Sequence, residues 1–306
     1  MTNGLQRRTK TRSALHMDTL VSIQVVSHES PEVLQHQLDL AFAAFSAVER
    51  VCSRFDPDSE LRRLCEIVGE PVPVSGLLFE AVRFAWEVAD MTHGVFDPTI
   101  GHRMEHAGFT RNYLTGEKTA PQALEPATYR DLLLNEENRT ILLKKPLRLD
   151  LGAVAKGLAI DLAAQGLRRA GGFLINAGGD VYAGGRNEHG ELWRVGIQHP
   201  AHPDEIITSL TLTDSAVCTS GSYERVAVST DQTLTHHLLD PRTGTSAQDL
   251  LSCTVTASYA MMADAFSTAA FLLGPTDGQA LLDEAGLSGL FITPDLTILG
   301  GREASK

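Results

Sequence analysis

Cysteine is scarce in this 306-residue sequence, and its four cysteines show no metal-ligand spacing. Cys52, Cys65, Cys218 and Cys253 form neither a CxxC pair nor a Cys/His pattern of the kind that zinc sites use. A structural zinc site is therefore not expected. Chains of this length bury enough surface to fold without disulfides, so we expect reduced, buried thiols.

Basic residues are too few to balance the acidic ones. Lysine and arginine number 26 against 38 aspartates and glutamates, which gives a net charge of −12. Proteins that bind nucleic acid or anionic lipid by releasing counterions need the opposite sign. A nucleic-acid partner is therefore not expected, and a site for a small anion would need a local lysine or a metal ion.

Long apolar runs are missing as well. No stretch reaches the length of about 18 apolar residues that a membrane span needs. Residues 1–20 include basic side chains but lack the apolar stretch of a signal peptide. We therefore expect no membrane span, a flexible N-terminal segment over residues 1–16, and a cytoplasmic location; a leader upstream of this sequence would instead make the protein periplasmic.

Helical and strand patterns are mixed along the chain. The periodicity predicts helices over 31–50, 75–94, 129–133 and 260–273, the last ended by Gly274. It predicts strands over 19–26, 140–143 and, as several short segments, within 192–255. No internal repeat and no series of βα units occurs, so the sequence predicts a mixed α/β or α+β fold with a central sheet region.

Residues 147–180 form the clearest unit. The pattern predicts a strand at 147–151, a helix at 153–170 and a strand at 173–176, which together make a β-α-β crossover. Asp150 would end the first strand, and Lys156 would lie in the first turns of the helix. Such a corner presents backbone N–H groups and a lysine to an anion. A solvated lysine at a helix start is the alternative.

Asp264 and Thr268 are four residues apart in the apolar helix predicted at 260–273. That spacing puts their oxygens on one face of the helix, where they could bind a hard cation such as Mg²⁺. The alternative is structural: the aspartate would favour the helix dipole, and the threonine would bond to a carbonyl of its own helix.

A histidine pair, His236-His237, precedes the turn at 240–244. On a strand the two imidazoles point to opposite faces, so one of them could face a site and act as a base. A hydrogen-bonded histidine of the core is the alternative.

In their order along the chain, these segments resemble the ApbE family, the FAD:protein FMN transferases. The resemblance extends from Met17 to about Gly274. The matching motifs are Met17-Asp18-Thr19, Ser53-Arg54-Phe55, 57–61, 96–101, 150–157, 176–180, 219–221, 237–244, and Ala263-Asp264 with Thr268. Two positions differ: Asp18 stands where the family commonly has glycine, and Phe55 where tyrosine is frequent, which keeps a stacking ring but loses a hydroxyl.

The resemblance implies one two-lobed domain over residues 17–306, with FAD held in a cleft as substrate. It places Mg²⁺ on Asp264, Thr268 and the backbone carbonyl of Ala153, and it gives Asp264 and His237 to the catalytic machinery. It places around the FAD the residues Met17, Phe55, Asp97, Thr99, Asp150, Lys156 and Leu239.

The activity implied is Mg²⁺-dependent transfer of the FMN half of FAD to a threonine or serine hydroxyl, with release of AMP. The acceptor is a flavoprotein with an Asp/Ser-Gly-Ala-Thr/Ser segment. His237 is expected to take the hydroxyl proton, with Asp240 or Asp150 as alternatives. Two other functions remain open: an Mg²⁺-dependent FAD pyrophosphatase that uses water as acceptor, and an FAD-binding protein without turnover.

Overall fold

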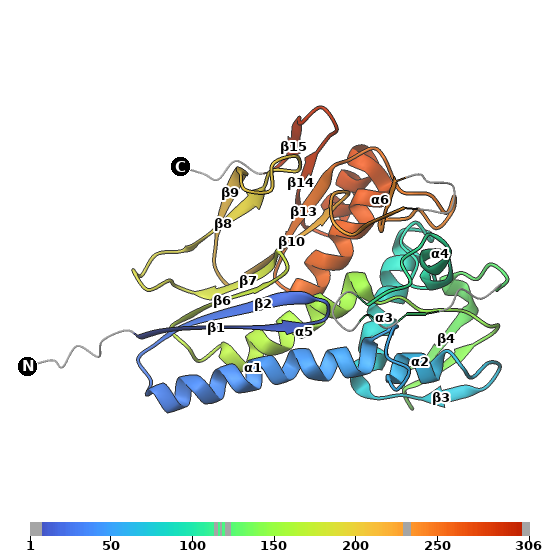
Figure 1. The fold of residues 1–306 in the computed structure, drawn as a ribbon, viewed down its shortest axis with the longest axis horizontal. Helices are drawn as coiled ribbons and strands as arrows, with labels where there is room; N and C mark the ends of the chain where they lie inside the picture. The colour runs from blue at the N-terminus through green and yellow to red at the C-terminus, as the bar shows by residue number, and fades with distance from the viewer. Residues whose placement is uncertain (1–7, 113–115, 117, 120–123, 229–233, 302–306) are drawn as a thin grey trace, which may run out of the picture.

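An eight-stranded sheet in which every neighbouring pair is antiparallel forms the centre of the fold (Figure 1). The computed structural model describes residues 8–112, 116, 118–119, 124–228 and 234–301. The strands are, in spatial order, β1 (Arg8–His16), β2 (Thr19–Ser27), β6 (Gly172–Ala177), β7 (Asp180–Gly185), β10 (Ser215–Gly221), β13 (Ser252–Ala257), β14 (Ser288–Ile292) and β15 (Ile298–Gly300).

Three long helices cover one face of this sheet: α1 (Pro31–Cys52), α5 (Gly152–Leu167) and α6 (Ala260–Glu284). α1 packs against α5, and α5 packs against α6 (Figure 1). Ser30 begins α1 by accepting a hydrogen bond from the Val33 N–H at 3.4 Å, as expected for an N-cap serine before Pro31. The buried side chains of these helices and of the strands beneath them form the main apolar core. The mixed α/β fold with a central sheet is therefore confirmed.

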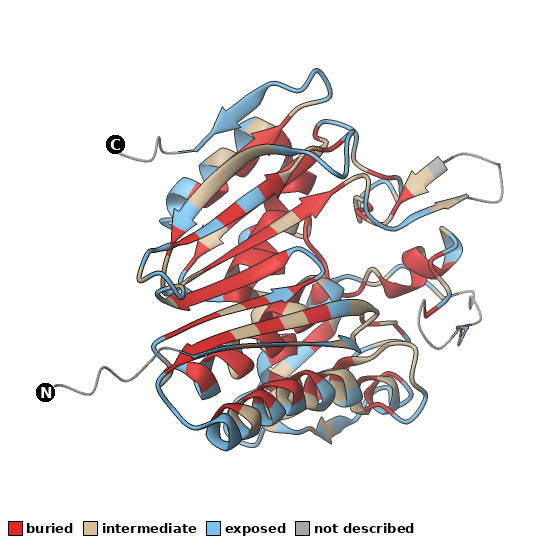
Figure 2. Cartoon of the chain, turned by 60° about the vertical axis from the view of Figure 1, so that its left-hand side comes forward, coloured by how far each residue is buried: buried red, intermediate tan, exposed pale blue. Residues whose placement is uncertain are grey.

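A separate hairpin, β8 (Trp193–Gln198) and β9 (Ile206–Leu212), packs on the other face of the sheet (Figure 2). Trp193 is buried there, and its Nε1 donates to the carbonyl of Gly184 at 3.0 Å. A small second core forms beneath the hairpin. The strands in the middle of the sheet are thus mostly buried, and most of the polar residues that they carry are small ones such as Ser, Thr and Cys.

The remaining elements lie at the end of the molecule beyond α1 and α6 (Figure 1). The helical ones are α2 (Glu60–Leu64), α3 (Gly76–Met91), α4 (Gly101–His106) and a 3₁₀ turn at Tyr129–Asp131. The strands are β3 (Pro71–Pro73), β4 (Leu132–Asn135), β5 (Thr140–Leu143), β11 (Val226–Val228) and β12 (Leu234–His236). None of the helices in the described residues has the length and apolar character that crossing a membrane would take.

Three local predictions need correction. Residues Arg8–His16, expected to be flexible, form strand β1 through full pairing with β2, whereas residues 1–7 lie outside the described residues. The expected strand at 147–151 is reduced to a single bridge between Arg148 and Ile100, so there is no β-α-β crossover. The helix expected at 129–133 is one 3₁₀ turn that leads directly into β4. Pairing partners decided by tertiary structure override local propensity in each case.

Other predictions are borne out. Gly274 does break the last helix, with φ 79° and ψ 176°, although a further helical segment continues to Glu284. All four cysteines are free and buried.

The turn between β1 and β2 explains one difference from the family pattern. Met17 and Asp18 both have positive φ, 50° and 61°. Glycine adopts this conformation without strain, and aspartate tolerates it better than most residues. The Met17 N–H is held by Oε1 of Glu49 at 3.0 Å. Asp18 therefore preserves the turn that a glycine would make.

Candidate functional site

One cavity of about 970 Å³ collects nearly all the residues that the sequence singled out. It is lined by the β1–β2 turn, the loop after α1, the first turns of α5, the ends of β6, β7 and β10, and α6. The predicted residues that line it are Met17, Phe55, Asp97, Asp150, Ala153, Lys156, His237, Leu239, Asp264 and Thr268. These segments are far apart in the sequence, so the cavity is a product of the tertiary fold.

Thr99 is the exception, because it is not part of the cavity lining. Its hydroxyl donates to Oδ1 of Asp97 at 2.7 Å, and its N–H donates to the same oxygen at 2.8 Å. The other oxygen of Asp97 accepts the Tyr129 N–H at 3.0 Å. Burial raises the pKa of Asp97, and these hydrogen bonds oppose the rise. Thr99 therefore orients Asp97, which lines the cavity, and does not itself line it.

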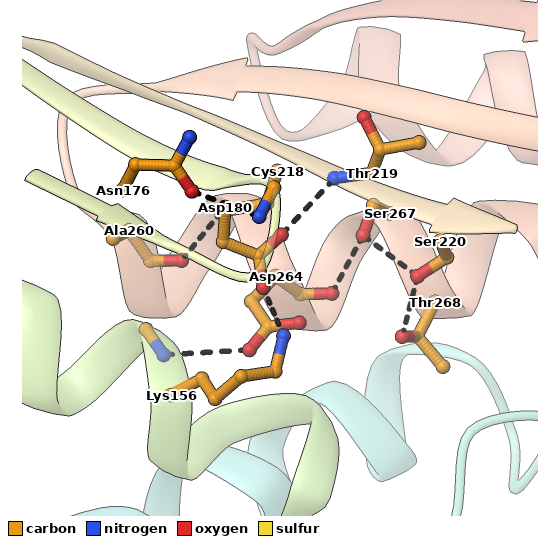
Figure 3. A network of polar contacts seen from close by, with 12 residues as sticks. Lys156, Asn176, Asp180, Cys218, Thr219, Ser220, Ala260, Asp264, Ser267 and Thr268 are labelled. Atoms are coloured by element: carbon orange, nitrogen blue, oxygen red, sulfur yellow. Dashed lines mark hydrogen bonds and ion pairs between the residues drawn. The ribbon is translucent and has the colours of Figure 1, made fainter. Parts of the chain in front are cut away.

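A chain of hydroxyl groups connects α6 to β10 at the cavity wall (Figure 3). Oγ of Ser220 lies 2.9 Å from both Oγ of Ser267 and Oγ1 of Thr268. Ser267 in turn donates to the carbonyl of Asp264 at 2.9 Å. The Thr268 side chain thus faces β10 and the cavity. Ser220 and Ser267 were not among the predicted site residues.

Asp264 is a buried carboxylate with little support from its own surroundings. It is 5% exposed, and its Oδ2 accepts one long hydrogen bond of 3.4 Å from the Gly157 N–H. Burial raises its pKa to about 7, while the charge of Lys156 works in the other direction. A carboxylate in such a place is costly unless a cation accompanies it.

Lys156 is engaged in a partly buried ion pair and is not the solvated lysine of the alternative interpretation. Its Nζ contacts Oδ2 of Asp180, whose Oδ1 accepts the Thr219 N–H at 3.2 Å. Burial disfavours the charged ammonium, but Asp180 and Asp264 outweigh that effect and raise the pKa of Lys156. The three charged side chains converge in Figure 3.

These donors fit a hard divalent cation. Two buried carboxylates share one lysine, which leaves an excess of negative charge at the wall. Within the described part of the chain, no group of three or more His, Cys, Asp or Glu side chains could hold a metal ion by itself. A single carboxylate with hydroxyl and carbonyl oxygens is instead the donor set of Mg²⁺ that completes its shell with water or phosphate.

Arg54 joins two of the predicted FAD-binding residues and was not itself predicted. Its Nε lies 2.9 Å from Oδ2 of Asp150, and its guanidinium carbon lies 4.3 Å from the centre of the Phe55 ring. The other oxygen of Asp150 accepts the Gly152 N–H at 2.7 Å. With both oxygens engaged, Asp150 is a poor candidate for the base.

His237 lines the same cavity as Asp264, Thr268 and Lys156. Burial, followed by the charge of Arg225, lowers its pKa to about 3, so the imidazole is neutral near pH 7. Its Nδ1 is buried and has no hydrogen-bond partner among the described residues. The other alternative base, Asp240, is not in the cavity lining, and Arg242 holds its pKa below the usual value although burial opposes this.

Known proteins resemble this chain in sequence, and solved structures resemble it in fold. The sequence profile of the ApbE family matches residues 17–291. A Klebsiella pneumoniae protein named FAD:protein FMN transferase is 30% identical over 287 residues, which are 90% of this chain and 81% of that protein. A Treponema pallidum protein with the same name is 31% identical over 316 residues, which are 94% of this chain and 85% of that protein.

Solved structures agree with the sequence comparison. The crystal structure of the ApbE protein of Thermotoga maritima superposes with a TM-score of 0.85 at 28% identity, covering 96% of this chain and 97% of that one. The flavinyl transferase ApbE of Pseudomonas stutzeri has the same fold, with a TM-score of 0.81 at 23% identity and coverage of 97% and 96%. The chain belongs to the ApbE family.

Proposed function

We propose that this chain is an FAD:protein FMN transferase that moves the FMN half of FAD onto a threonine or serine hydroxyl of an acceptor flavoprotein and releases AMP. The observation that carries the proposal is the cavity that joins Asp264, Thr268 and Lys156 to Met17, Phe55 and the other predicted FAD-binding residues. At about 970 Å³ it lies at the upper end of the range for small-molecule sites, as a dinucleotide requires.

The reaction breaks one bond to phosphorus and forms another. The acceptor hydroxyl oxygen bonds to the phosphorus of the FMN half, the phosphoanhydride bond to the AMP half breaks, and AMP leaves with the bridging oxygen. The hydroxyl proton must go to a base. Transfers of this type depend mainly on alignment and on neutralisation of charge.

Asp264, Thr268 and the carbonyl of Ala153 would hold Mg²⁺ at the cavity wall. When bound, the ion would neutralise charge on the diphosphate. Lys156, fixed by Asp180, adds a second cation from the start of α5, where the helix dipole also favours an anion. This local charge is what an acidic protein needs to bind an anionic substrate.

Phe55 and Met17 supply apolar surface for a ring of the substrate, and Arg54 keeps Phe55 in place through the contact with its ring. His237 is the remaining base candidate within the lining. Its unpartnered Nδ1 would gain a hydrogen bond from a hydroxyl that reached it. A bound diphosphate would counter the positive charge of Arg225, one of the causes that lower the pKa of this imidazole.

A single incubation separates the candidate functions. The chain is mixed with FAD, Mg²⁺ and a peptide with an Asp-Gly-Ala-Thr segment, and peptide mass and free AMP are followed together. Transferase activity gives a peptide heavier by the FMN group and an equal amount of AMP. A control peptide with valine in place of the threonine should stay unmodified.

The alternatives give different products. AMP and free FMN without a modified peptide would show a pyrophosphatase, in which water replaces the hydroxyl. FAD binding with neither product would show a binding protein without turnover. Either result would overturn the proposed transfer.

A further inference from the structure

Helices α5 and α6 meet at unusually close range where they carry the predicted metal ligands. A Cβ on Gly157 would lie 2.4 Å from Cα of Met261 and 2.5 Å from the carbonyl oxygen of Ala260. Atoms cannot approach that closely, so the backbone of α5 touches the first turn of α6 only because residue 157 is a glycine. The two helices run antiparallel, since higher positions on α6 contact lower positions on α5.

Asp161, one turn beyond Gly157, binds the beginning of α6. Its Oδ1 accepts the Ala260 N–H at 2.7 Å, and its Oδ2 accepts the Met261 N–H at 2.9 Å. These N–H groups have no partner within their own helix, and the N-cap residue Tyr259 contributes no side-chain cap. The carboxylate of Asp161 on α5 therefore caps the N-terminus of α6. Its negative charge interacts favourably with the positive end of the helix dipole.

We call the two hydrogen bonds that Asp161 accepts from Ala260 and Met261 the clamp. The clamp joins the start of α6 to one position along α5. In the part of the chain that the structure describes, the hydrogen bonds between these helices are the two of Asp161 and the 3.4 Å bond from Gly157 to Asp264. Asp264 follows Ala260 by about one turn, and Ala153 precedes Asp161 by about two turns. A shift of α6 along α5 would therefore move Asp264 and Thr268 relative to Ala153 and Lys156.

We propose that Asp161 is a positioning residue for the metal site: by clamping the start of α6, it places Asp264 and Thr268 opposite Ala153. This inference rests on the proposed function, because it concerns the Mg²⁺ ligands assigned there. Asp161 is not in the cavity lining and does not touch the substrate. Its effect reaches the metal only through the helix that it holds.

The test is the metal dependence of two variants, Asp161→Ala and Asp161→Asn, in the full chain. Asn keeps one acceptor oxygen but turns an NH₂ group toward the second N–H, so its effect should be smaller than that of Ala. We expect the Mg²⁺ concentration for half-maximal FMN transfer to rise about tenfold in the Ala variant, the size seen when partners behind metal ligands are removed. Binding of Mn²⁺ alone, followed by electron paramagnetic resonance, should weaken in parallel.

A destabilised control distinguishes positioning from general loosening. Ile141→Ala removes a fully buried side chain of β5, which is outside the cavity lining, α5 and α6. It should lower the melting temperature but leave the Mg²⁺ and Mn²⁺ titrations as in the wild type. If Asp161→Ala does not fold, Asp161→Asn carries the test.

The outcomes separate the two proposals. If the Asp161 variants fold and keep the wild-type metal titrations, the positioning role is overturned while the metal site stands. The role is likewise overturned if the Mg²⁺ and Mn²⁺ titrations of the Asp161 variants shift no more than those of Ile141→Ala when the melting temperatures of the variants are equally lowered. A wild-type protein that binds no Mn²⁺ and transfers FMN without a divalent cation would overturn the metal site itself, and the positioning role with it.

Discussion

The guanidinium of Arg54 and the carboxylate of Asp150 form an ion pair of 2.9 Å between the loop after α1 and the start of α5. Both side chains are only 14% exposed, so the pair is well shielded from water. Because Arg54 also lies over the Phe55 ring, it fixes two of the predicted contacts to FAD at once. The loop and α5 therefore present one rigid wall to the cavity.

Arg54→Met should weaken FAD binding without removing any atom that the substrate is predicted to touch. Asp150 would be left shielded and without its cation, and Phe55 would lose its support. We expect the FAD dissociation constant to rise by about tenfold to a hundredfold, corresponding to a loss of about 1–3 kcal/mol. Titration of FAD by flavin fluorescence measures the change.

The matched control is Arg242→Met. Arg242 pairs with Asp240 at 2.7 Å, but that pair lies outside the cavity lining and Arg242 is 59% exposed. It should leave FAD affinity unchanged. Equal affinities for Arg54→Met and wild type would mean that the ion pair does not hold the wall in place.

Local signals in the sequence predicted the helices that carry the site. Ser30-Pro31 predicted the start of α1, and Gly274 breaks α6 where predicted. The spacing of Asp264 and Thr268 put them on one helix face, and both do line the cavity. Each of these signals is contained within a few residues, so the prediction made from it does not depend on contacts with distant parts of the chain.

Features that depend on distant partners were missed. Arg54 and Asp180 meet their partners only across the fold, and the sequence around them gives no sign of charge pairing. Thr99 was taken for a substrate contact because it belongs to a motif, whereas its side chain orients Asp97. A motif thus marks a functional segment without telling which of its side chains faces the cavity.

Asp264→Asn should abolish Mg²⁺-dependent transfer, yet it should not destabilise the metal-free protein. The buried carboxylate has one weak hydrogen bond, so a neutral amide of the same size avoids most of its desolvation cost. We expect the free energy of unfolding in EDTA at pH 8 to stay equal or rise by a few kcal/mol. Urea unfolding measures stability, and AMP release measures activity.

Thr268→Val serves as the comparison, because it removes a neutral donor and keeps the shape. It should weaken the use of Mg²⁺ less than Asp264→Asn does. A stable Asp264→Asn protein with normal transfer would show that the metal lies elsewhere, and a strongly destabilised one would show that the carboxylate is structural.

Lys156→Met should weaken both FAD binding and folding. It leaves Asp180 and Asp264 buried without a cation, which costs about 3–5 kcal/mol when one partner of a buried pair is removed. Adding Asp180→Asn removes one of the stranded charges, so the double variant should regain much of the stability. FAD affinity should stay low, since the missing ammonium is not replaced.

The same two variants test how far the site is shielded. Because Lys156 sits in a partly buried network, the loss of FAD affinity should change little between low and moderate salt. Urea unfolding and flavin fluorescence give the two quantities. If the double variant bound FAD as tightly as the wild type, Lys156 would be only the partner of Asp180.

His237→Gln should slow transfer by about a hundredfold or more while leaving FAD affinity nearly unchanged, the effect expected for loss of a base. In the wild type, burial and Arg225 keep the pKa of His237 near 3, far below the usual 6.5. Transfer should therefore not decline through this group as the pH falls from 7.5 to 6, whereas an ordinary histidine would lose activity several-fold. Initial rates of AMP release between pH 5.5 and 8 check this. A normal rate in His237→Gln would exclude the imidazole as the base.

Asp161 should make the stability of the metal-free protein depend on pH. Burial raises the pKa of its carboxyl from 3.8 to about 6, although the Met261 and Ala260 N–H groups oppose the rise. The unfolded chain loses this proton near pH 3.8 and the folded protein only near pH 6, so the contribution of the group is fully present below pH 3.8 and is lost as the pH rises through 6. A difference of about two pKa units corresponds to a loss on the order of 3 kcal/mol.

Asp161→Asn cannot ionise and should lack that loss. Its free energy of unfolding, compared with the wild type at each pH, should therefore improve between pH 4 and about pH 6 and level off above that, even if the lost hydrogen bond makes it less stable at pH 4. Urea unfolding in EDTA at four pH values in this range gives the comparison. A difference that stayed constant would mean that folding does not change the proton affinity of Asp161, so that the two N–H groups fully offset the effect of burial on its carboxylate.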